Sequence, residues 1–95
     1  MATNRRMFRF STEDEAVAMA NDTEYGLAAY FFSKDMARVW RVAARLEYGM
    51  IGVNETSVVS ATAPFGGVKQ SGLGRENGPH GIDEFLEEKY ICMQH

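Results

Sequence analysis

Cysteine is almost absent, since Cys92 is the only one in a chain of 95 residues. A single cysteine excludes an internal disulfide and fits a reducing compartment. No stretch approaches the roughly 18 consecutive apolar residues that a membrane-spanning helix requires. The formal net charge is −3, without the basic excess that is typical of proteins that bind nucleic acid. We therefore expect a soluble, intracellular protein that engages neither a membrane nor a nucleic acid.

A secretory signal is also missing. Residues 1–7 contain two arginines, but no apolar stretch follows them. We expect a cytoplasmic location, or the mitochondrial matrix if the source is a eukaryote. With 45% hydrophobic and 24% charged residues the composition is that of a globular chain, and its length suffices for one small domain.

The first third of the chain predicts a strand, a helix and a second strand. Phe8–Phe10 alternates apolar and charged side chains, which predicts the end of a strand. Thr12 and Glu15 have the spacing of a capping box, so a helix is expected to follow. The continuous apolar run Leu27–Phe32 predicts a strand that is covered on both faces.

A second helix and a third strand are expected next. Ser33 is the expected helix cap, and apolar residues then recur at helical spacing up to Leu46, with Trp40 expected in the core. Gly49 ends this helix, and Met50–Asn54 predicts a strand. The order strand–helix–strand–helix–strand predicts an α/β fold with parallel strands. Neither strand-to-helix turn carries Gly-x-Gly-x-x-Gly, which excludes a Rossmann-type dinucleotide site.

A long loop is expected from residue 55 to about Pro79, followed by a short helix over Gly81–Glu88 and a strand over Lys89–Met93. Loops of that length without secondary structure are uncommon and often functional.

The run Pro64–Glu76 is the most informative part of this loop. It contains Gly66, Gly67, Gly72 and Gly74. Each glycine costs about 0.5–1 kcal/mol relative to alanine in regular structure, so turns with positive φ or close backbone approaches are expected here. The apolar residues in the run argue against a flexible linker.

This run reads Pro-Phe-Gly-Gly-Val-Lys-Gln-Ser-Gly-Leu-Gly-Arg-Glu. It resembles the C-terminal signature of the NAD(P)-dependent aldehyde dehydrogenase family, and every fixed position of that signature is filled. Phe8–Ser11, Tyr25–Phe32 and Gly49–Glu55 are similar to the same part of the family. Gly81–Cys92 is most similar to the ending of succinate-semialdehyde dehydrogenases.

The resemblance implies three parts. Residues 8–88 would be the C-terminal part of an aldehyde dehydrogenase catalytic domain and residues 89–95 an oligomerisation strand, whereas residues 1–7 match nothing. The segment Tyr90–Met93 would pair with the sheet of a neighbouring subunit in a homo-oligomer, and packing within its own chain is the alternative.

The family's reaction needs a thiolate that attacks the aldehyde and a general base that activates water. The family's cysteine and glutamate for these steps lie upstream of this region. The resemblance therefore implies that the complete enzyme uses NAD or NADP, and that this chain alone is inactive and binds no cofactor. Cys92, with His80 and His95 near it in sequence, is the alternative nucleophile, but its strand-like setting predicts a small apolar side chain. His80 and His95 lack the spacing of a metal-binding pair.

The resemblance also implies that part of the chain forms a wall of the substrate tunnel. Phe65 matches a position whose ring borders the aldehyde, and a plain core phenylalanine is the alternative. Relatives that act on succinate semialdehyde carry a serine where this chain has Val59, and Ser60 follows one position later. A different short semialdehyde, or a less polar aldehyde, therefore stays open as the substrate.

The other fixed positions are expected to support the loop. We expect Lys69, Arg75 and Glu76 to form an ion-pair network that pins it, with phosphate binding by Lys69 and Arg75 as the alternative. The expected loop-supporting residues are Gly66, Gly67, Lys69, Gly72, Gly74, Arg75 and Glu76.

Two functions from different classes follow. In the first, the chain is a piece of an oxidoreductase that oxidises succinate semialdehyde or a similar short semialdehyde, and it supplies substrate wall and subunit interface. In the second, it is an inactive remnant that acts as an interaction module through its terminal strand. A small unrelated α/β ligand-binding domain is a third reading, which would require the glycine-rich match to be accidental.

Overall fold

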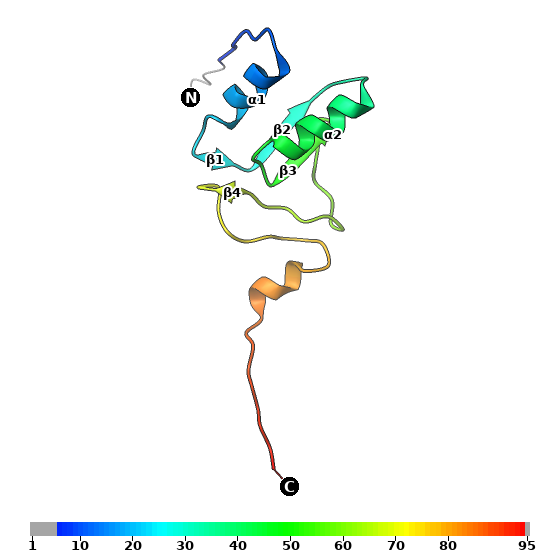
Figure 1. Cartoon of the computed structure of the whole chain (residues 1–95). Coiled ribbons are helices and arrows are strands. Elements are labelled where there is room, and N and C mark those ends of the chain that lie inside the picture. Colours follow the sequence, from blue (N-terminus) through cyan, green and yellow to red (C-terminus); the bar gives the residue numbers. More distant parts are fainter. Residues whose placement is uncertain (1–5, 95) are drawn as a thin grey trace, which may run out of the picture.

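The structure, a computed structural model, describes residues 6–94. Its elements in chain order are α1 (Glu13–Asn21), β1 (Tyr25–Gly26), β2 (Ala28–Phe31), α2 (Met36–Arg45), β3 (Met50–Val53), β4 (Val68–Lys69) and the 3₁₀ helix η1 (Gly81–Phe85). After η1 the chain runs away from the other elements as an extended tail (Figure 1). The tail accounts for the elongated dimensions of 70 × 39 × 23 Å.

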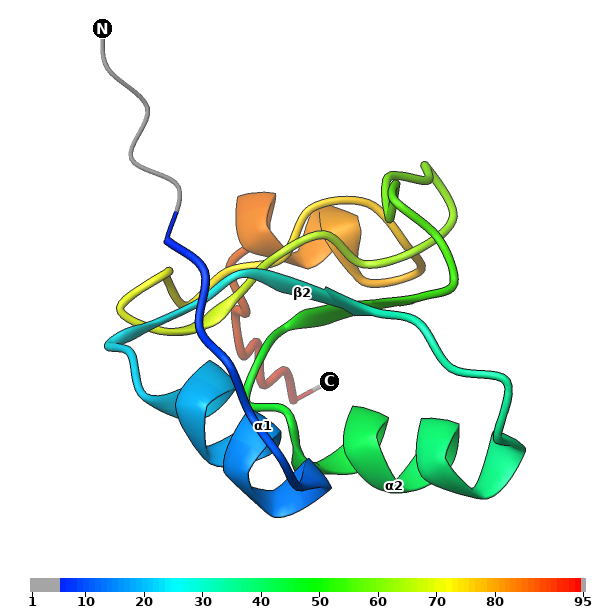
Figure 2. The ribbon, with the colours of Figure 1, turned by 90° about the horizontal axis from the view of Figure 1, so that it is seen from above.

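The parallel pair at the centre of the fold is the one that the sequence predicts. The register places Ala28 of β2 opposite Met50 of β3, and Phe31 opposite Val53. Because parallel strands need a crossover, α2 connects the two. Figure 2 shows α1 and α2 on one side of β2, and the glycine-rich segment with η1 on the other.

The first helix begins where the capping residues predict. The backbone N–H of Glu15 donates to Oγ1 of Thr12 over 3.2 Å, and the Glu15 carboxylate accepts from the N–H of Ser11 over 3.1 Å. The return bond thus reaches one residue before the cap. Val17 is the side chain that α1 buries, at 5% exposure.

The second helix differs from the prediction in its cap and in its buried face. Asp35 is the N-cap, because its carboxylate accepts from the N–H of Arg38 and the Ser33 hydroxyl accepts instead from the N–H of Asp35. Trp40 is 72% exposed, so its placement in the core was wrong. The half-buried stripe of α2 runs through Val39, Val42, Ala43 and Leu46, and Trp40 falls outside that stripe.

Two predicted strands do not form within the described residues. Phe8–Phe10 and Lys89–Met93 have no strand assignment, and their side chains are exposed. Both segments have the apolar pattern of a strand, but a strand also needs a neighbour that completes its backbone hydrogen bonds. The predicted helix over residues 81–88 is shorter, because η1 ends at Phe85.

The predicted structureless loop carries a strand of its own. β4 pairs antiparallel with β1, with Lys69 opposite Tyr25 and Val68 opposite Gly26. The loop is further closed by an antiparallel bridge between Phe65 and Glu76. The second half of the chain therefore folds back on the first.

The described residues bury few apolar side chains. Within residues 6–94, Val17 and Met50 are the two buried hydrophobic residues. More than 60% of the side chain is exposed at the following large apolar residues: Met7, Phe8, Phe10, Phe32, Met36, Trp40, Val59, Leu73, Ile82, Phe85, Leu86, Tyr90, Ile91 and Met93. Exposure on this scale is typical of surfaces that contact other protein. Among residues 6–94, no helix has the length and apolar character needed to cross a membrane.

Candidate functional site

The glycine-rich run is held in place by backbone and side-chain contacts at both of its ends. Phe65 and Glu76 exchange two backbone hydrogen bonds of 2.8 Å each. Arg75 donates from one guanidinium nitrogen to the carbonyl oxygens of Gly67, over 2.7 Å, and Gly74, over 2.9 Å. These bonds keep the run closed on itself.

The run also touches the sheet through its backbone. Gly66 and Gly67 are buried and pass directly beside Gly49. A Cβ on Gly49 would meet the Gly66 carbonyl oxygen and would lie 2.7 Å from the Gly67 Cα. A Cβ on Gly67 would lie 2.9 Å from the Gly26 carbonyl oxygen. Three backbone segments therefore meet here with no room for a side chain, as the glycines of the run predict.

Lys69 fastens the run to the first half of the chain. Its backbone has φ of +56°, and its ammonium group donates to the carbonyl oxygens of Asn21 (3.1 Å) and Thr23 (3.3 Å) and to a carboxylate oxygen of Glu47 (3.2 Å). Beside it, the Ser71 hydroxyl accepts from the N–H of Gly26 over 2.8 Å.

The predicted ion-pair network therefore takes a different form. Lys69 pairs with Glu47 and not with Glu76. Among the described residues Arg75 contacts carbonyl oxygens and no carboxylate, and Glu76 acts through its backbone. The run is held largely by backbone acceptors.

The candidate substrate-binding residues lie apart in this structure. Phe65 is half-buried and lines a cavity of about 350 Å³, together with Leu27, Arg75 and Phe85. Val59 is 71% exposed, and Ser60 is exposed with its hydroxyl 3.0 Å from that of Thr62. Neither Val59 nor Ser60 lines that cavity. The structure places Phe65 beside the same cavity as Arg75 and Phe85, but it does not bring Val59 or Ser60 there.

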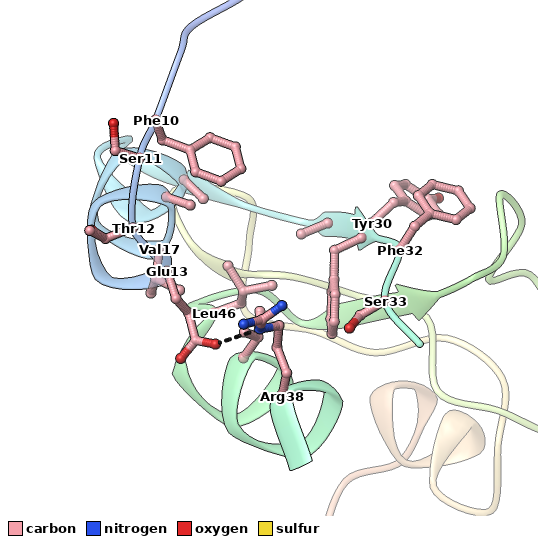
Figure 3. Close-up of a pocket in the computed structure, with 15 residues that line it drawn as sticks. Phe10, Ser11, Thr12, Glu13, Val17, Tyr30, Phe32, Ser33, Arg38 and Leu46 are labelled. Atoms are coloured by element: carbon pink, nitrogen blue, oxygen red, sulfur yellow. Dashed lines mark hydrogen bonds and ion pairs between the residues drawn. The ribbon is translucent and has the colours of Figure 1, made fainter. Parts of the chain in front are cut away.

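A larger cavity, of about 470 Å³, lies between α1, α2 and β2 and was not predicted (Figure 3). Its lining is mostly apolar and includes Phe10, Val17, Phe31 and Leu46. An apolar cavity of this size is typical of a surface that contacts further protein or an apolar ligand.

Charged side chains tie α1 to α2 at the side of this larger cavity. The carboxylate of Glu13 accepts from Arg41 over 2.6 and 2.7 Å and from Arg38 over 3.2 Å (Figure 3 draws the bond to Arg38). Arg45 pairs with Asp14 over 2.7 Å. The hydrogen bond from Arg41, with the second one from Arg38, lowers the pKa of Glu13 from 4.5 to about 2. The sequence could have predicted this cluster, because the three arginines are spaced along one face of α2 and the first turn of α1 is acidic.

Among the described residues, neither α-helix offers free N–H groups at its start for a phosphate. The N-terminus of α2 is already occupied by the carboxylate of Asp35, and the first turn of α1 carries Glu13, Asp14 and Glu15. A phosphate at either helix start would meet negative charge where it needs free N–H groups. No group of three or more metal-ligating side chains occurs in the part of the chain that the structure describes. Cys92 is exposed on the extended tail.

Comparison with known proteins identifies the family. Residues 6–91 match the aldehyde dehydrogenase family, and the chain belongs to it. It is 62% identical over 84 residues to the mitochondrial succinate-semialdehyde dehydrogenase of Oryza sativa, covering 88% of this chain and 16% of that protein. It is 60% identical over 87 residues to 3-sulfolactaldehyde dehydrogenase of Pseudomonas putida, covering 92% of this chain and 18% of that protein.

The same relationship appears among solved structures. The crystal structure of succinate-semialdehyde dehydrogenase from Burkholderia pseudomallei superposes with a TM-score of 0.85 at 59% identity, covering 90% of this chain and 18% of that one. The chain thus spans less than a fifth of the length of the relatives that it matches. The fold is that of part of an aldehyde dehydrogenase, with α/β character and small sheets.

Proposed function

We propose that the chain acts as the C-terminal part of the catalytic domain of an NAD(P)-dependent aldehyde dehydrogenase, and that the complete enzyme oxidises a short, acid-bearing aldehyde to the carboxylic acid. The observation that carries the proposal is the identity of about 60% to relatives named for succinate semialdehyde and 3-sulfolactaldehyde. Both names denote aldehydes with an anionic group, and succinate semialdehyde is the substrate that we favour.

Within that enzyme the chain would supply part of the wall of the aldehyde site and the loop that supports it. Phe65 is the proposed border of the aldehyde site, with Val59 and Ser60 on the same segment. The backbone bridge to Glu76 and the contacts of Arg75 support this role, because they hold the residues next to Phe65 in a fixed conformation. The nucleophile, the general base and the residues that bind NAD or NADP would belong to other parts of the enzyme.

The test is a chimeric subunit in which residues 6–91 replace the aligned segment of the Burkholderia pseudomallei enzyme. Formation of NAD(P)H is measured with succinate semialdehyde, glutarate semialdehyde, 3-sulfolactaldehyde and uncharged butanal, with the intact parent enzyme as control. We expect turnover, with at least one anionic aldehyde preferred over butanal. A folded, assembled chimera without activity, or one that prefers butanal, would contradict the proposal.

The 95-residue chain and one variant sharpen this test. The chain alone is expected to form no NAD(P)H, and turnover by it would direct attention to Cys92. In the chimera, Val59→Ser is expected to raise kcat/KM for succinate semialdehyde relative to 3-sulfolactaldehyde. An unchanged ratio would argue against a substrate-facing position 59.

The second candidate is an inactive interaction module. The exposed apolar tail favours it, since Tyr90 is 88% exposed and Ile91 is 69% exposed. We propose Tyr90–Met93 as the segment that would pair with a second aldehyde dehydrogenase subunit. Co-purification of the 95-residue chain with the intact Burkholderia enzyme, lost on Tyr90→Asp with Ile91→Asp, would support this reading, and the absence of co-purification would oppose it.

A further inference from the structure

The carboxyl ends of β2 and β3 are joined by one side chain. The backbone N–H of Asn54 donates to the carbonyl oxygen of Phe31 over 2.9 Å, which continues the parallel ladder. The Asn54 side chain then adds two more bonds to Ser33: its oxygen accepts from the Ser33 N–H, and its nitrogen donates to the Ser33 carbonyl oxygen, both over 2.9 Å. The amide therefore substitutes for a further residue of the strand.

The backbone of Asn54 turns at the same point. Its φ of +52° lies in the left-handed region, where asparagine is among the few tolerated residues besides glycine. The turn ends β3 and sends the chain into segment 55–64. That segment starts in a fixed direction, because the Glu55 carboxylate accepts from the N–H groups of Thr56 and Ser57. At its far end the segment is fixed by the bridge between Phe65 and Glu76.

We infer that Asn54 is a positioning residue for the substrate wall, because it sets the direction in which the segment carrying Val59 and Ser60 leaves the sheet. The inference rests on the proposed function for its link to substrate. Ligands of open α/β sheets bind beyond the carboxyl ends of the strands, which is where this amide sits. Only an amide provides both the acceptor for Ser33 N–H and the donor for Ser33 C=O while tolerating this turn.

Two variants separate the amide from the turn. Asn54→Gly keeps access to the left-handed backbone and removes both side-chain bonds. Asn54→Asp keeps the acceptor but places a carboxylate oxygen against the Ser33 carbonyl oxygen. Asn77→Gly is the matched control, because Asn77 also has a positive φ, of +58°, and its side chain makes no hydrogen bond with the residues that the structure describes.

Kinetics of the chimeric subunit test the role. For Asn54→Gly we expect KM for the preferred anionic aldehyde to rise about tenfold, because substrate binding must then order a segment that the two bonds to Ser33 otherwise hold, with KM for NAD(P) unchanged. Selectivity over butanal should fall by a similar factor. Asn54→Asp should move in the same direction and Asn77→Gly should not. A purely structural role would lower kcat for every aldehyde alike and leave the selectivity ratio intact, and that result would overturn the inference.

Amide exchange in the full 95-residue chain gives a readout that needs no activity. The Ser33 N–H should exchange at least tenfold faster in Asn54→Gly and at the unchanged rate in Asn77→Gly. Equal Ser33 exchange in all three proteins would refute the amide contact itself. If the chimera is inactive while Ser33 exchange responds, the proposed function fails and the contact stands without a substrate role.

Discussion

Replacing Gly49 with alanine is expected to destabilise the chain because three backbone segments meet there. The added Cβ would meet the Gly66 carbonyl oxygen and would lie 2.8 Å from the Gly66 carbonyl carbon and 2.7 Å from the Gly67 Cα. All three atoms lie at the Gly66–Gly67 peptide, so that backbone must move as a unit. It has little space to do so, since the Gly26 carbonyl oxygen and Ser71 lie against Gly67.

The expected cost follows from this confinement. Overpacking a filled site costs about 1–3 kcal/mol, and the upper part of that range applies when backbone must move. Moving the Gly67 carbonyl also stretches its 2.7 Å hydrogen bond from Arg75. We expect a loss of about 2–3 kcal/mol, which lowers the ratio of folded to unfolded chain by about 30- to 150-fold. The midpoint of thermal unfolding should fall by about 10–20 °C.

Urea and thermal unfolding of the 95-residue chain, followed by far-ultraviolet circular dichroism, measure this loss. Gly81→Ala is the matched control, because the nearest atom to an added Cβ there is the Glu76 carbonyl carbon at 3.5 Å, an ordinary contact. The control should change stability by no more than about 1 kcal/mol. If Gly49→Ala is as stable as Gly81→Ala, the close approach of the three backbones is refuted.

Three further perturbations test the contacts that tie the chain together. Because the pKa of Glu13 is lowered to about 2, its ionised carboxylate stabilises the fold above pH 4.5, and this stabilisation is lost as the pH falls toward 2. Glu13→Gln should abolish that part of the pH dependence of urea unfolding. An unchanged profile would contradict the ion pair with Arg41. Lys69→Met should lower the unfolding free energy by about 1–2 kcal/mol and speed proteolysis between residues 21 and 24, and equal cleavage rates would refute the anchor. Ser71→Ala leaves the part-buried N–H of Gly26 without its acceptor and should cost about 1–3 kcal/mol in urea unfolding, whereas a loss below about 0.5 kcal/mol would show that water replaces the hydroxyl.

The first half of the fold could be predicted because its signals are local. Thr12 and Glu15 lie within one turn of α1, and the apolar run of β2 is continuous. The β1–β4 pair could not be predicted, since each strand has two residues and the two are far apart in sequence. Trp40 was placed wrongly because periodicity identifies a helix more reliably than it identifies the face that packs.

The site was predictable to a similar degree. The glycines of the run indicate a close backbone approach, and the structure has one at Gly49. The partners of Lys69 could not be predicted from the sequence, because two of them are backbone carbonyls that any residue would provide. Asn54 was predicted only as the end of a strand. Its contact with Ser33 depends on the register of two strands that α2 separates in sequence.

From the pairing of β1 with β4 we expect an order of assembly during synthesis. α1, β2, α2 and β3 contact one another within residues 13–53, whereas the bond between Gly26 and Ser71 joins positions 45 residues apart. Closing the longer loop costs more entropy, and the N-terminal part leaves the ribosome first. The helices and the parallel pair can therefore form while the glycine-rich run is still in the exit tunnel. The run would then pack last, between the backbones of Gly26 and Gly49. A substitution in the run would affect that last step, and the first half of the chain would already be folded.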